Sequence, residues 1–119
     1  MKDVEFLKSN GVNVDQGLEL LGDMEMYDDT LNDFLEENEA RLDELNLYKT
    51  TGDMNNYAIL AHSMKSDSKY LGFTKLAEIA LDHELKGKEN DINYVTEHFN
   101  ELETEARRII DIVKKYLGK

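Results

Sequence analysis

The chain of 119 residues contains no cysteine, no proline and no tryptophan. The lack of cysteine excludes a disulfide framework, a thiolate nucleophile and a cysteine metal site, and it is compatible with a reducing compartment. The lack of proline removes the residue that most strongly breaks helices, and the 7 glycines stand singly along the chain. Long helices joined by short turns are therefore expected, and the predicted fold class is all-α.

Long hydrophobic segments are also missing. The longest uninterrupted apolar run, from Tyr57 to Ala61, has five residues, whereas roughly twenty are needed to cross a bilayer. Asp3 and Glu5 fall within the first turns of the chain, and no apolar signal-peptide core follows them. We therefore expect a cytoplasmic protein that does not contact a membrane.

Basic residues are scarce: 14 lysines and arginines stand against 26 aspartates and glutamates, which gives a net charge of -12. This balance argues against binding to nucleic acid or to anionic lipid. Between Asp23 and Leu45 ten acidic residues accompany one basic residue, Arg41, but between His62 and Lys88 five lysines accompany four acidic residues. An acidic partner should be tolerated only on this second, nearly neutral region. The alternative is that the acidic helices simply confer solubility.

Helix caps and apolar spacing predict one domain, residues 1–119, in which an antiparallel four-helix bundle (23–118) follows a short N-terminal helical extension (1–22). The extension should hold a helix from Asp3 to Ser9 and another that is capped by Asp15 and ends near Leu21. The bundle helices are expected from Met24 to Lys49, from the Asp53 cap to Leu71, from Lys75 to Lys86 and from the Asp91 cap onward, with Gly52, Gly72 and Gly87 closing the first three. The apolar stripe of the last helix comprises Ile92, Val95, Phe99, Leu102, Ala106, Ile109 and Val113. We expect a monomer.

His62 stands on a helix face without large apolar residues. At about 100° per residue, Lys65, Ser66 and Lys69 lie within about 60° of His62 on the helix, whereas the apolar stripe falls on the opposite side. The imidazole should therefore face solvent, where it can act as a nucleophile or proton carrier. Most exposed helical histidines have no such role, but an ammonium group one turn away favours an anion held on the ring.

The run from Ala61 to Ser68, followed by Leu71 and Gly72, resembles the signature of histidine-containing phosphotransfer (HPt) domains. The likeness extends to residues 12–18, to the acidic helix and to residues 76–84. The resemblance implies that His62 accepts a phosphoryl group from the aspartyl phosphate of a response-regulator receiver domain and passes it to another. It also implies Lys65 as the lysine that stabilises the phosphoryl group, and receivers or a hybrid histidine kinase as partners.

Other roles follow from the same resemblance. Glu84 matches a polar position that can hydrogen-bond the histidine ring and fix its tautomer, the alternative being a plain exposed glutamate. The expected docking residues are Ala58, Ser66, Lys69 and Gly72. Ser66 replaces a glycine that is common in the family, and Asp67 replaces a small neutral residue, so Ser66 should affect docking and Asp67 should affect packing. No cofactor of its own is expected, and Mg²⁺ should come with the partner receiver.

The remaining histidines and motifs of the chain favour no other chemistry. His83 lies on an apolar stripe and is expected to be a core histidine, and His98 is expected to be idle. A di-metal bundle needs Glu-x-x-His pairs, which no histidine here provides, so no metal site is predicted. The chain also lacks a phosphate-binding glycine loop, so no intrinsic kinase is expected. Two alternatives stay open: a non-phosphorylated adaptor of the same fold, and one domain cut from a larger hybrid kinase.

Overall fold

Six α-helices and no strand make up residues 3–119, the part of the chain that the computed structural model describes. The helices are α1 (Val4–Ser9), α2 (Val14–Leu21), α3 (Met24–Thr51), α4 (Met54–Leu71), α5 (Thr74–Lys88) and α6 (Ile92–Leu117). The all-α prediction is confirmed. Met1 and Lys2, with which the predicted extension begins, lie outside the described residues.

Short polar side chains begin most of these helices. Asp53 precedes α4 and its carboxylate accepts the N–H of the third residue along, as predicted. The cap of α2 was predicted wrongly at Asp15. The cap is Asn13, two residues earlier, whose side-chain oxygen accepts the Gln16 N–H at 3.1 Å, so α2 already begins at Val14.

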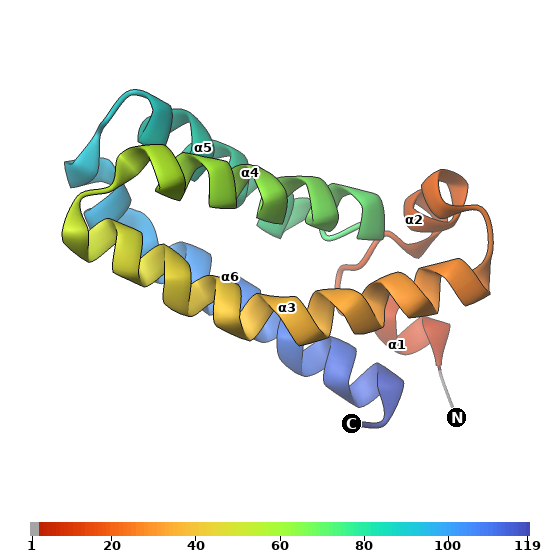
Figure 1. Ribbon diagram of the computed structural model, residues 1–119. Coiled ribbons are helices and arrows are strands. Elements are labelled where there is room, and N and C mark those ends of the chain that lie inside the picture. Colours follow the sequence, from red (N-terminus) through yellow and green to blue (C-terminus); the bar gives the residue numbers. More distant parts are fainter. Residues whose placement is uncertain (1–2) are drawn as a thin grey trace.

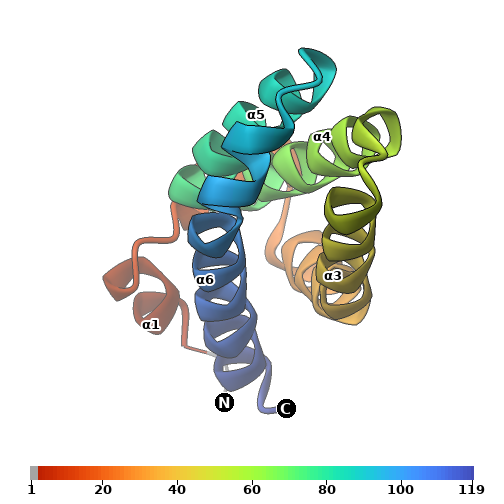
Figure 2. The same ribbon diagram turned by 90° about the vertical axis from the view of Figure 1, so that its left-hand side faces the viewer.

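The four long helices run up and down alternately (Figure 1). Each packs on two of the others, in the cyclic order α3, α4, α5, α6, and the contact between α4 and α5 is the most extensive. Figure 2 shows the bundle from one end, with the α4–α5 pair lying across α3 and α6. The two short helices lie together at the end of the bundle where α4 finishes and α3 begins (Figure 1). This arrangement leaves one face of the α4–α5 pair uncovered.

The core consists of the inward stripes of all four long helices together with Leu7, Val12 and Val14 from the N-terminal segment. Tyr27 is fully buried, and its hydroxyl donates to the backbone oxygen of Leu71 at 2.7 Å, which ties α3 to the end of α4. Ile92, which was predicted on the apolar stripe of α6, is instead exposed. It occupies the first position of the helix, where its neighbour is the turn at Gly52.

Two glycines have roles that depend on close packing. Gly72 ends α4 with a φ of 84°, and a Cβ there would lie 2.1 Å from the Asn13 carbonyl oxygen. Gly87 does not close its helix as predicted, because α5 continues to Lys88. A Cβ on Gly87 would lie 3.1 Å from the Cβ of Ala58, so this glycine lets α5 approach α4 closely.

Candidate functional site

His62 lies in the third turn of α4, and 55 % of its side chain is exposed. The buried apolar residues of α4, among them Tyr57, Ala61 and Met64, point into the bundle, which leaves the imidazole on the uncovered face of the α4–α5 pair. Its Nδ1 lies 2.8 Å from Oε2 of Glu84 on α5. Within residues 3–119 no protein group bonds its Nε2, so that nitrogen is open to solvent or to a partner.

Glu84 is not the solvent-exposed glutamate that was held as an alternative. Only 3 % of its side chain is exposed. Burial acts to raise the pKa of this carboxyl group, but hydrogen bonds from two lysines and from His62 outweigh burial and lower the pKa of Glu84 to about 2. Glu84 is therefore ionised at neutral pH, and its oxygens can only accept hydrogen bonds.

The ionised carboxylate decides which nitrogen of the ring carries the proton. Since Glu84 has no proton to donate, the 2.8 Å contact requires an Nδ1–H donor on His62. A neutral ring with its proton on Nδ1 carries a lone pair on Nε2, the exposed nitrogen. The expected contact between Glu84 and the ring is present, and the arrangement suits a nucleophile. The functional role of Glu84 stays a prediction.

Two lysines complete the cluster. Lys65 Nζ lies 3.1 Å from Oε1 of Glu84, and Lys88 Nζ lies 2.9 Å from Oε2. Lys65 Nζ is also 3.3 Å from Nδ1 of His62, but an ammonium group and an Nδ1–H are both donors and cannot bond each other. Lys65 pairs with Glu84 here, and its predicted pairing with an anion on the ring stays a prediction.

The predicted docking residues differ in what they can present. Ser66 is partly exposed and Lys69 is exposed, so both are available to a partner. Ala58 is only 4 % exposed and packs against Gly87, so it can form the floor of a contact but cannot project into one. Gly72 is buried against the backbone of Asn13, which makes its main role structural.

Four residues near the site were not predicted from the sequence. Ile59 is exposed beside His62, and Lys88 contacts Glu84. Leu81 and Leu85 are exposed on α5, where Leu81 lines a second surface pocket with Lys65 and Lys69. A surface pocket of about 370 Å³ next to the ring is lined by Asn55, Ala58, Ile59, His62, Ser63, Glu84 and Lys88. Spacing along α5 could have revealed part of this set, because Leu81, Glu84, Leu85 and Lys88 share one face at intervals of three and four.

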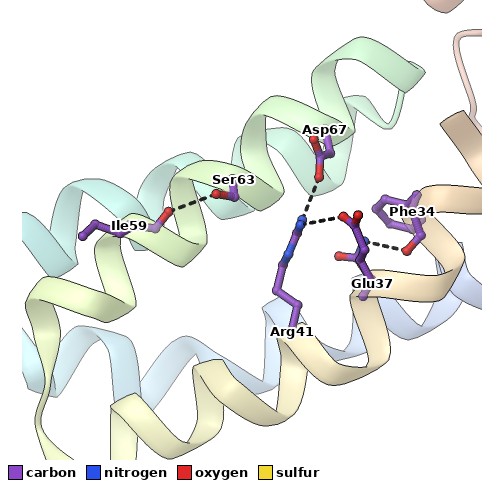
Figure 3. Close-up of polar contacts among 7 residues, drawn as sticks. Phe34, Glu37, Arg41, Ile59, Ser63 and Asp67 are labelled. Carbon is purple, nitrogen blue, oxygen red and sulfur yellow. Dashed lines mark hydrogen bonds and ion pairs between the residues drawn. The ribbon is translucent and has the colours of Figure 1, made fainter.

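Asp67 faces α3 and not the exposed histidine face (Figure 3). Its Oδ2 accepts a hydrogen bond from Arg41 Nη1 at 2.8 Å, and Arg41 Nη2 reaches Glu37 Oε2 at 3.2 Å. The Arg41 side chain is 11 % exposed and that of Asp67 is 40 % exposed. The contact joins α3 to α4, in keeping with the expected effect of Asp67 on packing.

The other two histidines lie away from this cluster. His83 is buried, as expected of a core residue, and its Nδ1 lies 2.8 Å from the Tyr57 hydroxyl. Burial lowers the pKa of His83. His98 stacks on Tyr94 and contacts Glu101 on its own helix. Within the described part of the chain, no three histidine or acidic side chains gather closely enough to hold a metal ion.

This geometry defines a class of protein: a helical bundle that carries an exposed histidine, held in one tautomer by a buried carboxylate and flanked by lysines, as a group carrier requires. A scan against protein families matches residues 29–111 to the Hpt domain, well over half of the chain. The chain therefore belongs to the Hpt domain family, as the resemblance implied. Searches of curated proteins and of solved structures returned no match.

Membership of the Hpt domain family defines the general role of the chain. An Hpt domain has a histidine phosphotransfer role in phosphorelay and is a carrier, not a kinase. Hpt domains generally interact with receiver domains. Among residues 3–119, no helix is both long enough and apolar enough to span a membrane.

Proposed function

We propose that this Hpt domain accepts a phosphoryl group on Nε2 of His62 from the aspartyl phosphate of one receiver domain and passes it to an aspartate of another. The observation that carries the proposal is the 2.8 Å contact between Nδ1 of His62 and Glu84, which leaves an exposed Nε2 with its lone pair. A phosphorelay carrier needs both features, a nucleophile that a second protein can reach and a ring that does not rotate.

The bonds formed and broken in the transfer balance without a general base. The Nε2 lone pair forms the new N–P bond while the P–O bond of the acyl phosphate breaks and releases the receiver's carboxylate. The ring proton stays on Nδ1 in its hydrogen bond to Glu84, so no proton has to leave His62. The second transfer reverses these steps on a different aspartate.

Lys65 would stabilise the phosphoryl oxygens once they arrive. A charge-assisted hydrogen bond is worth about 1.5–3 kcal/mol, and the partial exposure of Lys65 places its contribution at the lower end. We propose that Mg²⁺ is brought by the receiver, because among residues 3–119 the only carboxylate that touches His62 is Glu84, and its oxygens are engaged by cations.

The receiver would cover the uncovered face of the α4–α5 pair. Ile59 offers apolar area beside the ring, Leu81 and Leu85 offer it on α5, and Ser66 and Lys69 extend the face along α4. Exposed large apolar side chains grouped near a reactive residue are typical of a protein contact.

Phosphotransfer from a panel of phosphorylated receivers tests this proposal. Acid-labile phosphate should appear on the wild-type protein and be abolished by His62→Gln. His98→Gln is the matched control, since it removes a histidine remote from the cluster, and it should label at the wild-type rate. Lys65→Ala should slow labelling roughly tenfold, which corresponds to about 1.4 kcal/mol. Labelling of the His62→Gln protein would refute the assignment, and receivers that bind without transferring phosphate would favour the adaptor alternative.

A further inference from the structure

More cationic side chains contact the Glu84 carboxylate than are needed to orient the imidazole of His62. Oε2 lies 2.8 Å from Nδ1 of His62 and 2.9 Å from Nζ of Lys88, and Oε1 lies 3.1 Å from Nζ of Lys65. Orienting the imidazole requires only the first of these contacts. The two lysines come from different helices, Lys65 from α4 and Lys88 from the last turn of α5, one turn beyond Glu84 itself.

The proposed transfer places conflicting demands on Lys65. Its ammonium group pairs with Glu84 before transfer, and it must turn toward the phosphoryl oxygens during transfer. If Lys65 were the only cation, its departure before the N–P bond forms would leave a carboxylate that is 3 % exposed with a single neutral donor, the Nδ1–H. A nearly buried and poorly paired carboxylate is unfavourable, so Lys65 would be held back.

We propose that Lys88 is a positioning residue, which keeps the Glu84 carboxylate paired and in place while Lys65 moves to the phosphoryl group. This inference rests on the proposed function. Lys88 pairs with Oε2, the oxygen that holds the ring, whereas Lys65 pairs with Oε1. Lys65 can therefore leave without disturbing the oxygen that fixes His62.

The surroundings of Lys88 suit this role. Its side chain is 62 % exposed, yet its Nζ turns back one turn along α5 to reach Glu84. The exposed stem means that a substitution at Lys88 should not disturb the core. The lowered pKa of Glu84 accords with a second cation in place, because Lys88 is among the groups that lower it and its Nζ lies 2.9 Å from Oε2.

The test uses phosphoramidate, a small phosphoryl donor that needs no receiver docking, and measures the rate at which His62 is phosphorylated. In this reaction Nε2 bonds to phosphorus, the donor's P–N bond breaks and ammonia leaves. Lys88→Met should slow the reaction roughly threefold if its contact with Glu84 is as weak as an exposed ion pair, and roughly tenfold if the contact is a well-formed charged hydrogen bond. Lys88→Arg should restore the rate to within about twofold of wild type. Lys86→Met is the control, since it removes the same charge from α5 but its ammonium pairs with Glu89.

Repeating the Lys88→Met substitution in a Glu84→Gln variant shows whether Lys88 acts through Glu84. In Glu84→Gln the amide oxygen can still accept from Nδ1–H, but no carboxylate needs a cation. Adding Lys88→Met to Glu84→Gln should then change the rate by less than about twofold. An equal slowing in both backgrounds would overturn the proposal, since Lys88 would then act directly on the donor, and so would a Lys88→Met rate equal to wild type. Failure of the proposed function is a separate result, in which the wild-type protein gains no phosphate on His62.

Discussion

Gly87→Ala perturbs the closest approach of the two helices that form the site. Gly87 lies three residues after Glu84 on α5 and faces Ala58, which lies four residues before His62 on α4. A Cβ at position 87 would lie 3.1 Å from the Ala58 Cβ, 3.3 Å from its Cα and 3.4 Å from its backbone nitrogen. None of these atoms can rotate away, because all belong to the helix backbone or to the first side-chain carbon. The helices must therefore separate by a few tenths of an ångström.

The expected change in stability is the balance of two effects. Replacing glycine by alanine inside a helix gains about 1 kcal/mol of helix propensity. Adding a methyl group to a closely packed contact costs about 1–3 kcal/mol. We expect a net loss of about 1 kcal/mol in the free energy of unfolding, measured by urea denaturation. Since the same separation lengthens the 2.8 Å contact between Glu84 and His62, phosphorylation should also slow roughly two- to fivefold.

A double-mutant cycle identifies the cause. Ala58→Gly removes the methyl group that the new Cβ would meet, so the loss caused by Gly87→Ala should be smaller in the Ala58→Gly background. A Gly87→Ala protein that is about 1 kcal/mol more stable than wild type would refute the packing argument, because the propensity gain would then be unopposed.

Two further predictions concern charged contacts. Asp67→Asn should lower the free energy of unfolding by about 0.5–1.5 kcal/mol, since Arg41 keeps Glu37 as a partner, and should leave the rate of phosphorylation within about twofold of wild type. Thermal unfolding checks the loss of stability, with Asp43→Asn as the control because it removes an exposed charge. A large loss of phosphorylation in Asp67→Asn would contradict the expected rate. Burial raises the pKa of Glu84, but its contacts with Lys88, His62 and Lys65 outweigh burial and lower the pKa to about 2 in the folded state, against about 4.3 for an unperturbed glutamate. The ionised carboxylate therefore stabilises the fold above pH ~4.3, and this stabilisation is lost as the pH falls toward 2. The difference in unfolding free energy between wild type and Glu84→Gln should therefore shrink between pH 5 and pH 3, and a difference that does not vary with pH would show that the carboxylate is not held in its charged form.

Local signals predicted most of the fold. Asp53 and Gly72 bound α4 as expected, because a helix cap is a local contact that the adjacent residues determine. Gly87 was misread because a glycine near a helix end is equally consistent with a cap and with a close helix contact, and only the packing of α5 on α4 separates the two. Ile92 was misread because apolar spacing does not show where the neighbouring helices stop.

The site was only partly predictable for a similar reason. Helical spacing alone placed His62 and Lys65 on one outward face, since both belong to α4. Glu84 is 22 residues away on another helix, and only the family resemblance brought it to the ring. Lys88, Ile59, Leu81 and Leu85 were missed because the functional face is shared by two helices, whose relative rotation the periodicity of either one does not specify.

The contacts of Glu84 also suggest what the nearly neutral region does on this acidic protein. One carboxylate stands between the ammonium groups of Lys65 and Lys88, so the cluster carries an excess of positive charge before transfer. Because the ring keeps its proton on Nδ1 and becomes positive when Nε2 is phosphorylated, transfer of a dianionic phosphoryl group adds a net charge of about -1, which cancels that excess. The rest of the chain is strongly acidic, with a net charge of -12 overall. Under the proposed function, an acidic docking face that is attracted to the cluster before transfer loses that attraction afterwards, and we expect the transfer itself to promote release of the donor.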